Sequence, residues 1–178
     1  MTAENIASYL EKASLRLPDK KAILSANGKS FPEKSFLELY QDVKATAAYL
    51  ESRGVKKHDK TLLFVRSGYE LIVLAFSLFF LGAVPIIIDP GMGLKSVLRC
   101  IRSTRPTHMV GIPIAHLVSQ AFRKPFQSVR NRILVRPKMF SSFALEGQTV
   151  KELIPADCSP DDLAAIVFTS GSTGPPKG

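Results

Sequence analysis

The sequence has few cysteines and no motif that would use them together. Cys100 and Cys158 lie far apart and form no Cys-x-x-Cys pattern, so neither a disulfide scaffold nor a zinc site is expected. Two free thiols suit a reducing compartment, and we therefore expect a cytoplasmic protein. The first residues also lack a basic start followed by an apolar stretch, which argues against a secretory signal. No repeat of the solenoid kind is present.

Acidic residues are missing from a long internal segment. Between Pro90 and Leu145 there are ten Lys or Arg and no Asp or Glu, whereas the formal net charge of the whole chain is +9. Such a basic segment could attach to nucleic acid or to anionic lipid. It lacks the interleaved aromatic residues on which single-stranded nucleic acids stack. We therefore read it as a solvated surface and expect no nucleic-acid partner, while contact with a membrane surface stays open.

A run of eighteen residues without a charge, 71–88, is long enough to be considered as a membrane span. Gly82 and Pro85 interrupt this run. The Leu, Ala and Phe residues of 69–81 predict a buried helix, and the β-branched residues of 84–88 predict a buried strand. Parallel strands that are covered on both faces read as continuous apolar runs. We therefore favour a helix that leads into a core strand over a membrane span.

Helical and strand patterns alternate along the chain. Helices are expected at 3–15, 36–50, 69–81, 94–103 and 114–122, and strands at 61–65, 84–88, 108–112, 132–135 and 163–168. A hairpin with Asn27-Gly28 as its turn is expected over 20–31. Ser35 and Glu38 predict a capping box at the start of the second helix, and Gly54 predicts its end. This alternation implies an α/β fold with a parallel, doubly wound sheet, whose ligands bind at the carboxyl ends of the strands.

The last predicted strand runs directly into a loop of hydroxyl residues, glycines and one lysine. Residues 168–178 read Phe-Thr-Ser-Gly-Ser-Thr-Gly-Pro-Pro-Lys-Gly. Glycines let successive backbone N–H groups turn toward one anion, while hydroxyls and a lysine add donors and charge, so the composition suits phosphate binding. A polar turn after a strand would fit the composition about equally well. The spacing matches neither Walker A nor the Gly-x-Gly-x-x-Gly fingerprint.

Residues 168–178 closely resemble the signature loop of the adenylate-forming superfamily, which holds acyl-CoA synthetases, fatty-acyl-AMP ligases, luciferases and peptide-synthetase adenylation domains. Residues 80–90, Phe-Leu-Gly-Ala-Val-Pro-Ile-Ile-Ile-Asp-Pro, resemble an earlier motif of the same superfamily. Residues 36–54 resemble the helix before its first core strand. Within the superfamily, 89–93 and 110–116 are similar to the branch of olefin β-lactone synthetases and fatty-acyl-AMP ligases, with acyl-CoA synthetases as close competitors.

The resemblance implies an ATP-dependent acid ligase that uses Mg²⁺. A carboxylate would attack the α-phosphate of ATP to give an acyl-adenylate and pyrophosphate. The acyl group would then pass to a thiol such as that of CoA, or close on a β-hydroxyl of the substrate to give a β-lactone. The expected substrate is a small carboxylic acid, such as a fatty acid or β-hydroxy fatty acid. Matched by position, the residues that would hold the β- and γ-phosphates are Thr169, Ser170, Gly171, Ser172, Thr173, Gly174 and Lys177.

Other parts of the superfamily's site follow the loop in sequence. These are the adenine pocket, an acidic residue near magnesium, the aspartate that binds the ribose hydroxyls and a catalytic lysine. We therefore expect residues 1–178 to form the N-terminal part of an AMP-binding domain with an incomplete doubly wound sheet. Catalytic residues would lie downstream of Gly178, and the chain alone would be inactive. The alternative is a non-catalytic basic α/β module that binds anionic lipid or nucleic acid.

Several other polar residues are candidates for a role. His116 could lie near the site, although a lone histidine is more often structural. His58 and His108 show no convergent partner in the sequence, and we read both as ordinary histidines. Asp161 and Asp162 could form a metal-binding pair, but their place before the final strand favours a loop or the start of a helix.

Overall fold

The computed structural model describes residues 5–24, 33–135 and 153–169. Within them, an all-parallel sheet has the strand order β6-β5-β3-β4-β7. Its strands are β3 (Lys60–Phe64), β4 (Val84–Ile88), β5 (His108–Gly111), β6 (Asn131–Leu134) and β7 (Ile166–Phe168). The predicted strands are confirmed to within one residue, except that β7 begins three residues after the expected start. The register places Pro85 of β4 opposite Ala165, and because proline has no N–H to donate, pairing begins only at Ile86 and Ile166.

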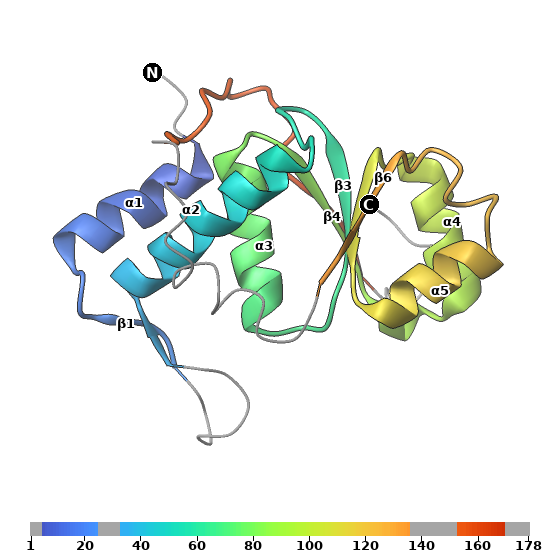
Figure 1. Cartoon of the computed structure of the whole chain (residues 1–178), viewed down its shortest axis with the longest axis horizontal. Coiled ribbons are helices and arrows are strands. Elements are labelled where there is room, and N and C mark those ends of the chain that lie inside the picture. Colours follow the sequence, from blue (N-terminus) through green and yellow to red (C-terminus); the bar gives the residue numbers. More distant parts are fainter. Residues whose placement is uncertain (1–4, 25–32, 136–152, 170–178) are drawn as a thin grey trace.

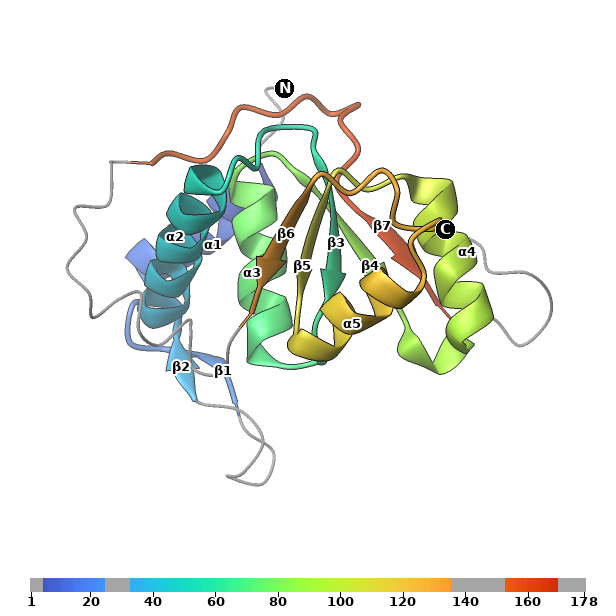
Figure 2. The same ribbon diagram turned by 45° about the vertical axis from the view of Figure 1, so that its right-hand side comes forward.

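Helices cover both faces of this sheet. They are α1 (Ile6–Arg16), α2 (Phe36–Ser52), α3 (Tyr69–Phe80), α4 (Leu94–Thr104) and α5 (Pro113–Ala121), all close to the predicted ranges. Figures 1 and 2 show α1, α2 and α3 on one face and α4 and α5 on the other. The chain therefore winds in both directions from β3, which confirms the doubly wound α/β prediction.

Alternation along the strands divides the core into two clusters. Leu63 and Val110 point into the cluster formed with α1, α2 and α3. Their neighbours Leu62 and Met109 point into the cluster formed with α4 and the segment that follows α5. All four side chains are buried. Because the side chains of a strand alternate between faces, an uninterrupted apolar strand supplies both layers at once.

The uncharged run 71–88 divides into a helix and a strand, as predicted. Most of it lies in α3 and β4, which Gly82 joins with a φ of +65°. A Cβ at Gly82 would lie 2.9 Å from Lys57 Cγ and 3.2 Å from Ala156 Cβ, so this tight connection requires glycine. In the described parts of the chain, no helix is long and apolar enough to cross a membrane.

The predicted boundaries of α2 are confirmed in detail. Glu38 N donates to Ser35 Oγ at 3.2 Å, and Ser35 N donates to Glu38 Oε2 at 2.7 Å, so both halves of the capping box are present. The bond from Ser35 N lowers the pKa of Glu38, and this effect is larger than the rise that burial causes. At the other end, Gly54 takes a φ of +87° just after the helix.

A small two-stranded sheet precedes α2. β1 (Lys21–Ile23) pairs in antiparallel fashion with β2 (Lys34–Ser35). The first strand of the expected hairpin is thereby confirmed. The proposed turn at Asn27-Gly28 and the expected second strand near Phe31 lie outside the described residues.

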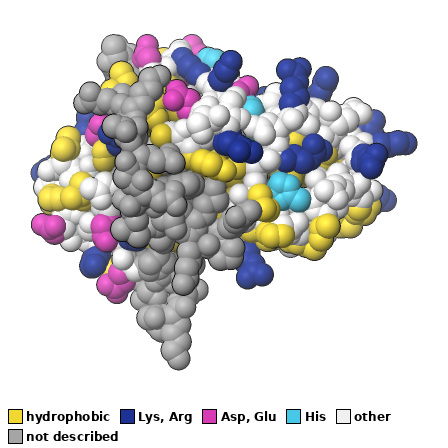
Figure 3. Space-filling view, in the orientation of Figure 1, with side chains coloured by type: hydrophobic (Ala, Val, Ile, Leu, Met, Phe, Trp, Pro, Cys, Tyr) yellow, Lys and Arg dark blue, Asp and Glu magenta, His cyan; other side chains and the backbone are white. Residues whose placement is uncertain are grey.

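The two faces of the domain differ in surface charge. In Figure 3, Lys and Arg gather over the side that carries α4 and α5, whereas Asp and Glu lie mainly over the other half. On α4, Lys95, Arg99 and Arg102 are exposed and Val97 and Ile101 are buried, as the helical spacing predicts. The basic residues of the acidic-free segment therefore lie largely on the surface of one helical layer.

Candidate functional site

The carboxyl ends of the parallel strands meet along one edge of the sheet, which we call the carboxyl edge. After β3 the chain turns into α3 on one face, and after β4 it turns into α4 on the other face (Figure 2). Adjacent strands whose connections leave on opposite faces create a crevice, and doubly wound sheets bind ligands there. This edge is therefore the candidate functional site.

β7 brings the start of the predicted phosphate loop to this edge. Phe168 pairs with Ile88 of β4, and its carbonyl accepts a hydrogen bond from Asp89 N at 3.1 Å. The Phe168 side chain is 7% exposed, whereas Thr169, the next residue, is exposed at the carboxyl edge. The other predicted phosphate-binding residues lie outside the described part of the chain and stay predictions. They are Ser170, Gly171, Ser172, Thr173, Gly174 and Lys177.

The Asp-Pro pair after β4 forms a structured turn beside β7. Asp89 Oδ1 accepts a hydrogen bond from Gly91 N at 2.8 Å and caps the short 3₁₀ helix η1 (Pro90–Met92). Gly93 follows with a φ of +76° and leads into α4. A carboxylate that caps its own turn stabilises the local backbone. Asp89 therefore stabilises the turn that borders the crevice next to Thr169.

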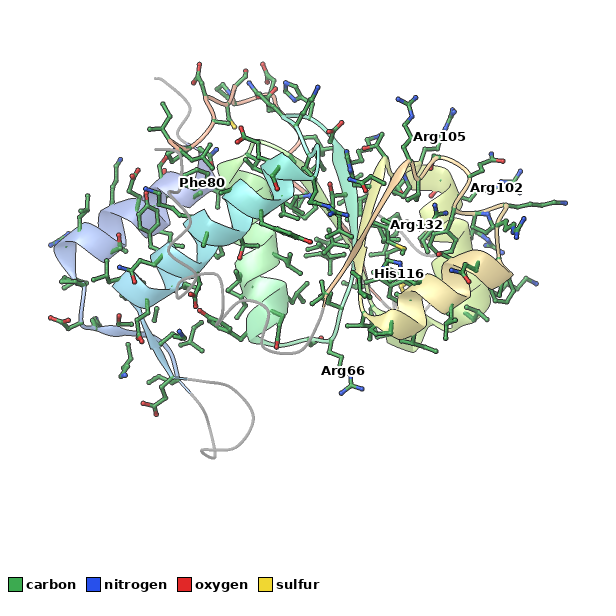
Figure 4. All side chains as sticks on the ribbon, viewed as in Figure 1. Arg66, Phe80, Arg102, Arg105, His116 and Arg132 are labelled. Carbon is green, nitrogen blue, oxygen red and sulfur yellow. The ribbon has the colours of Figure 1, made fainter. Side chains whose placement is uncertain are left out.

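Arg66 lies at the same edge, and the sequence reasoning missed it. It is exposed and lies two residues after the end of β3, and Figure 4 shows its side chain projecting from the carboxyl edge. The available signal was its position, because the residues that follow a central parallel strand line the crevice. Arg66 adds a positive charge to an edge that otherwise carries few charged side chains among the described residues.

His116 lies at the carboxyl end of β5. Its Nε2 is 3.1 Å from the carbonyl oxygen of Gly111, the last residue of that strand. The approach of α5 to β5 is close, since a Cβ at Gly111 would lie 2.9 Å from Ala115 Cβ. The ring is thus anchored to the backbone, in keeping with a structural histidine, while a functional role for it stays a prediction.

The opposite edge of the sheet, the amino edge, holds the other two histidines. His108 Nε2 is 3.1 Å from Asp59 Oδ2, and His58 Nδ1 is 3.9 Å from Asp162 Oδ1. The sequence showed no partner for either histidine, whereas the fold brings a carboxylate close to each. The partners come from loops that precede different strands, and a parallel sheet brings such loops together although they are distant in sequence.

Asp162 anchors the turn that leads into β7. It accepts a hydrogen bond from Ser159 N at 2.8 Å and lies 3.6 Å from Lys57 Nζ. The bond from Ser159 N, with the charges of Lys57 and His58, lowers the pKa of Asp162. The loop interpretation of Asp161 and Asp162 is thus supported, and no cluster of three or more His, Cys, Asp or Glu suited to a metal ion occurs within 5–24, 33–135 and 153–169.

Both cysteines are free, as expected, and neither is activated as a nucleophile. Cys100 is buried in α4, and burial raises the pKa of its thiol. Burial is also the main cause that raises the pKa of Cys158. Because the thiolate is the reactive species, a raised pKa makes both side chains poor candidates for covalent chemistry.

The described strands form a doubly wound α/β sheet, and β7 ends at its carboxyl edge, where folds of this class bind their ligands. A model of the AMP-binding enzyme family matches residues 10–178. The chain therefore belongs to the AMP-binding enzyme family, and so to the adenylate-forming superfamily that its loop resembles.

Individual relatives agree with this membership. The chain is 33% identical over 186 aligned residues to an olefin beta-lactone synthetase of Xanthomonas campestris pv. campestris, covering 98% of this chain and 33% of that protein. It is 24% identical to a 2-succinylbenzoate–CoA ligase of Bacillus mycoides, with 98% and 32% covered. The chain thus spans about a third of the length of these curated relatives.

Solved structures show the same fold. The crystal structure of a long-chain-fatty-acid-CoA ligase (FadD1) from Archaeoglobus fulgidus superposes with a TM-score of 0.79 at 23% identity, covering 100% of this chain and 37% of that one. The N-terminal domain of FACL13 from Mycobacterium tuberculosis gives a TM-score of 0.79 at 21% identity, with 100% and 44% covered. Both confirm the prediction of an α/β fold like the N-terminal portion of an adenylate-forming enzyme.

Proposed function

We propose that this chain supplies the phosphate-binding part of an ATP-dependent enzyme that activates a carboxylic acid as an acyl-adenylate. The observation that carries the proposal is the position of Thr169, which leaves β7 at the carboxyl edge beside Asp89. Membership in the AMP-binding enzyme family supports the use of ATP. The loop residues that follow Thr169 in sequence would then enter the crevice at the switch point of the sheet.

In the proposed reaction, a carboxylate oxygen of the acid attacks the α-phosphorus of ATP. The bond between that phosphorus and the oxygen bridging to the β-phosphorus breaks, and pyrophosphate leaves with the electron pair. Backbone N–H groups and hydroxyls of the loop would hold the β- and γ-phosphates in line. Lys177 would neutralise charge that develops on pyrophosphate. Mg²⁺ would enter with ATP as part of the substrate and would supply positive charge to its phosphates.

The proposed substrate class is a fatty acid or a β-hydroxy fatty acid. The resemblance of 89–93 and 110–116 to the β-lactone synthetase branch supports it, as does the 33% identity to an olefin beta-lactone synthetase. The acyl group would next pass to the thiol of CoA or to the β-hydroxyl of the same substrate. Only a β-hydroxy acid carries an internal nucleophile. Lactone formation would therefore require a β-hydroxy acid as the substrate, whereas transfer to CoA would not.

We further propose that residues 1–178 are the N-terminal part of an AMP-binding domain, with the groups that bind adenine and complete catalysis following Gly178. The match to about a third of each curated relative supports this division. The reading frame beyond Gly178 provides the first check. A downstream sequence without any Gly-rich, acidic or Thr-Gly-Asp-like motif would contradict it.

The functional test is carboxylate-dependent exchange of labelled pyrophosphate into ATP. We expect no exchange from the 178-residue chain and exchange from the extended protein when a medium- or long-chain fatty acid is supplied. In the extended protein, Lys177→Gln should lower the exchange rate about 100-fold, by analogy with removal of one transition-state charge partner. Lys20→Gln, an exposed lysine near β1, is the matched control and should leave the rate unchanged.

The two proposals fail in different ways in this assay. Strong exchange by the 178-residue chain alone would overturn the proposed division of the domain. An extended protein that exchanges with no carboxylic acid, or in which Lys177→Gln is as active as the unaltered protein, would overturn the proposed role of the loop.

A further inference from the structure

A basic cleft lies at the amino edge of the sheet, between the end of α4 and the segments that lead into β5 and β6. The cleft encloses about 740 Å³. Its walls are formed by Arg102, Arg105, Thr107, Pro125, Gln127, Ser128 and Arg130. In Figure 4, Arg102 and Arg105 lie at the end of the domain opposite Arg66, and a parallel strand of five residues separates the two edges by about 16 Å. The cleft is therefore distinct from the candidate site at the carboxyl edge.

The described part of the chain places no carboxylate in an ion pair with the arginines of this cleft. Arg102, Arg105 and Arg130 are exposed, and within the described ranges none of them forms an ion pair with a carboxylate. The sequence from Pro90 to Leu145 contains no Asp or Glu that could supply one locally. Guanidinium groups held near one another repel, and an anion that bridges them removes this repulsion. Their planar donors also match the geometry of phosphate oxygens.

The backbone around the cleft is fixed before any ligand binds. Arg105 takes a φ of +50° at the C-cap of α4, a left-handed conformation that glycine adopts most readily. Thr107 N donates to Lys60 O at 2.8 Å, and Arg130 N donates to Thr107 O at 2.9 Å. These bonds connect the segments that lead into β3, β5 and β6, so Arg105 and Arg130 project from hydrogen-bonded backbone.

The cleft also contains an unused polar atom. Ser128 Oγ is buried and has no hydrogen-bond partner among the residues that the structure describes. Buried hydroxyl groups normally have a partner, and an orphaned one at the wall of a cationic cleft can donate to an anion. Ser128 thus adds a neutral donor to the charged ones, as anion sites commonly combine the two.

We propose that this cleft binds a phosphate group, with Arg105 and Arg130 as its charged partners and Ser128 as a hydroxyl donor. The phosphate could belong to a soluble phosphorylated molecule or to the headgroup of an anionic lipid, and both present the same oxygens to the guanidinium groups. The inference does not depend on the proposed ATP chemistry, because it concerns the opposite edge of the sheet.

The test is a calorimetric titration of the 178-residue chain with inorganic pyrophosphate at low salt. All proteins carry Lys177→Gln, so that binding at the predicted loop is weakened throughout. Arg105→Gly and Arg130→Gln should each weaken pyrophosphate binding about tenfold, as expected when one charge-assisted contact is lost. Arg105→Gly is a favourable variant because glycine suits the left-handed backbone, and a circular-dichroism melt checks that it is folded. Arg16→Gln removes the same charge from the distant α1 and should leave the affinity unchanged.

A second arm separates the two sources of phosphate. The same proteins are sedimented with vesicles of phosphatidylglycerol and phosphatidylcholine, and with vesicles of phosphatidylcholine alone. If the chain binds pyrophosphate and Arg105→Gly weakens this binding, the result supports a soluble ligand. If the chain binds phosphatidylglycerol vesicles and Arg105→Gly weakens that binding, the result supports a lipid headgroup. The proposal is overturned if the chain binds neither probe. It is also overturned if Arg105→Gly and Arg130→Gln bind as tightly as their parent, or if Arg16→Gln weakens binding as much as they do.

Discussion

The two helical layers that cover the sheet are stabilised by different means. In the layer of α1, α2 and α3, polar side chains are buried and bonded to one another across the helices. In the layer of α4 and α5, the described contacts with the sheet are mainly apolar, and the outer surface carries charge of one sign (Figure 3). Specific polar bonds therefore fix the arrangement of the first layer. The second layer is held by apolar packing despite the repulsion between its surface charges.

The centre of the first layer is the Asp42 side chain, which is buried on α2. The Tyr69 hydroxyl of α3 donates to its Oδ2, and Lys34 Nζ of β2 lies 3.2 Å from the same atom. Burial, followed by the bond to Asp42, raises the pKa of Tyr69 well above its ordinary value, so the hydroxyl remains a donor. At the other end of α3, Asn5 is a second buried polar side chain, and it donates to Phe79 O at 2.7 Å and to Ala156 O at 2.9 Å.

The largest expected effect comes from breaking this network. Asp42 is 2% exposed, and Asp42→Ala would leave Lys34 and Tyr69 without their shared acceptor. Removing one member of a buried, bonded ion pair typically costs about 3–5 kcal/mol. We therefore expect the free energy of unfolding, measured by urea denaturation, to fall by that amount.

Tyr69→Phe is the matched variant for this experiment. It removes only the hydroxyl and leaves the pair of Asp42 with Lys34, so its cost should be about 1–2 kcal/mol. If Asp42→Ala is no more destabilising than Tyr69→Phe, the network does not distinguish the first layer from the second.

The second expected effect concerns the packing of α5 against the sheet. Gly111→Ala would place a Cβ 2.9 Å from Ala115 Cβ and 3.4 Å from Phe64 O. Overpacking a well-filled core typically costs about 1–3 kcal/mol, and we expect a loss of stability in this range. Gly54→Ala has open space around its Cβ and tests the backbone cost of a positive φ without a clash. A smaller loss for Gly111→Ala than for Gly54→Ala would show that the layer of α4 and α5 is loosely packed.

A third effect is expected at the N-terminus of α2. Ser35→Ala removes the side-chain acceptor for Glu38 N and should destabilise the protein by about 1 kcal/mol. The folded-state pKa of Glu38 is lowered, so its contribution is present above the ordinary pKa near 4.5 and is lost as the pH falls through the folded value. The difference in stability between the unaltered protein and Glu38→Gln should therefore shrink as the pH is lowered from 6 toward 3. A difference that grows on acidification would contradict the sign of this shift.

The sequence predicted most of the fold because the decisive signals were local. The capping box at Ser35, the breaker at Gly82 and the β-branched strand 84–88 each depend on neighbours in the chain. The late start of β7, at Ile166, was missed because β7 pairs with β4, where Pro85 has no N–H to donate. Register between distant strands leaves no trace in either segment read alone.

The candidate site was predicted only in part, for a similar reason. The loop after β7 has a recognisable composition, and its first residue Thr169 lies at the expected edge. The partners of His58 and His108 were missed because Asp162 and Asp59 approach them only when separate strands enter the same sheet. The clustering of Arg105 with Arg130 at the amino edge was missed for the same reason.

The smallest expected effect tests the surface charge that separates the two layers. Lys95 and Arg99 are like charges at i and i+4 on α4, a spacing that destabilises a helix by about 0.2–0.5 kcal/mol. Arg99→Gln keeps a comparable helix propensity and should stabilise the protein by about that amount at low salt.

Arg16→Gln, in the last turn of α1, should have the opposite sign because it removes a cation that interacts favourably with the helix dipole. Both effects should vanish in about 1 M salt, where the screening length falls to about 3 Å. If both variants shift the melting temperature in the same direction, surface repulsion is not the property that sets the α4 and α5 layer apart.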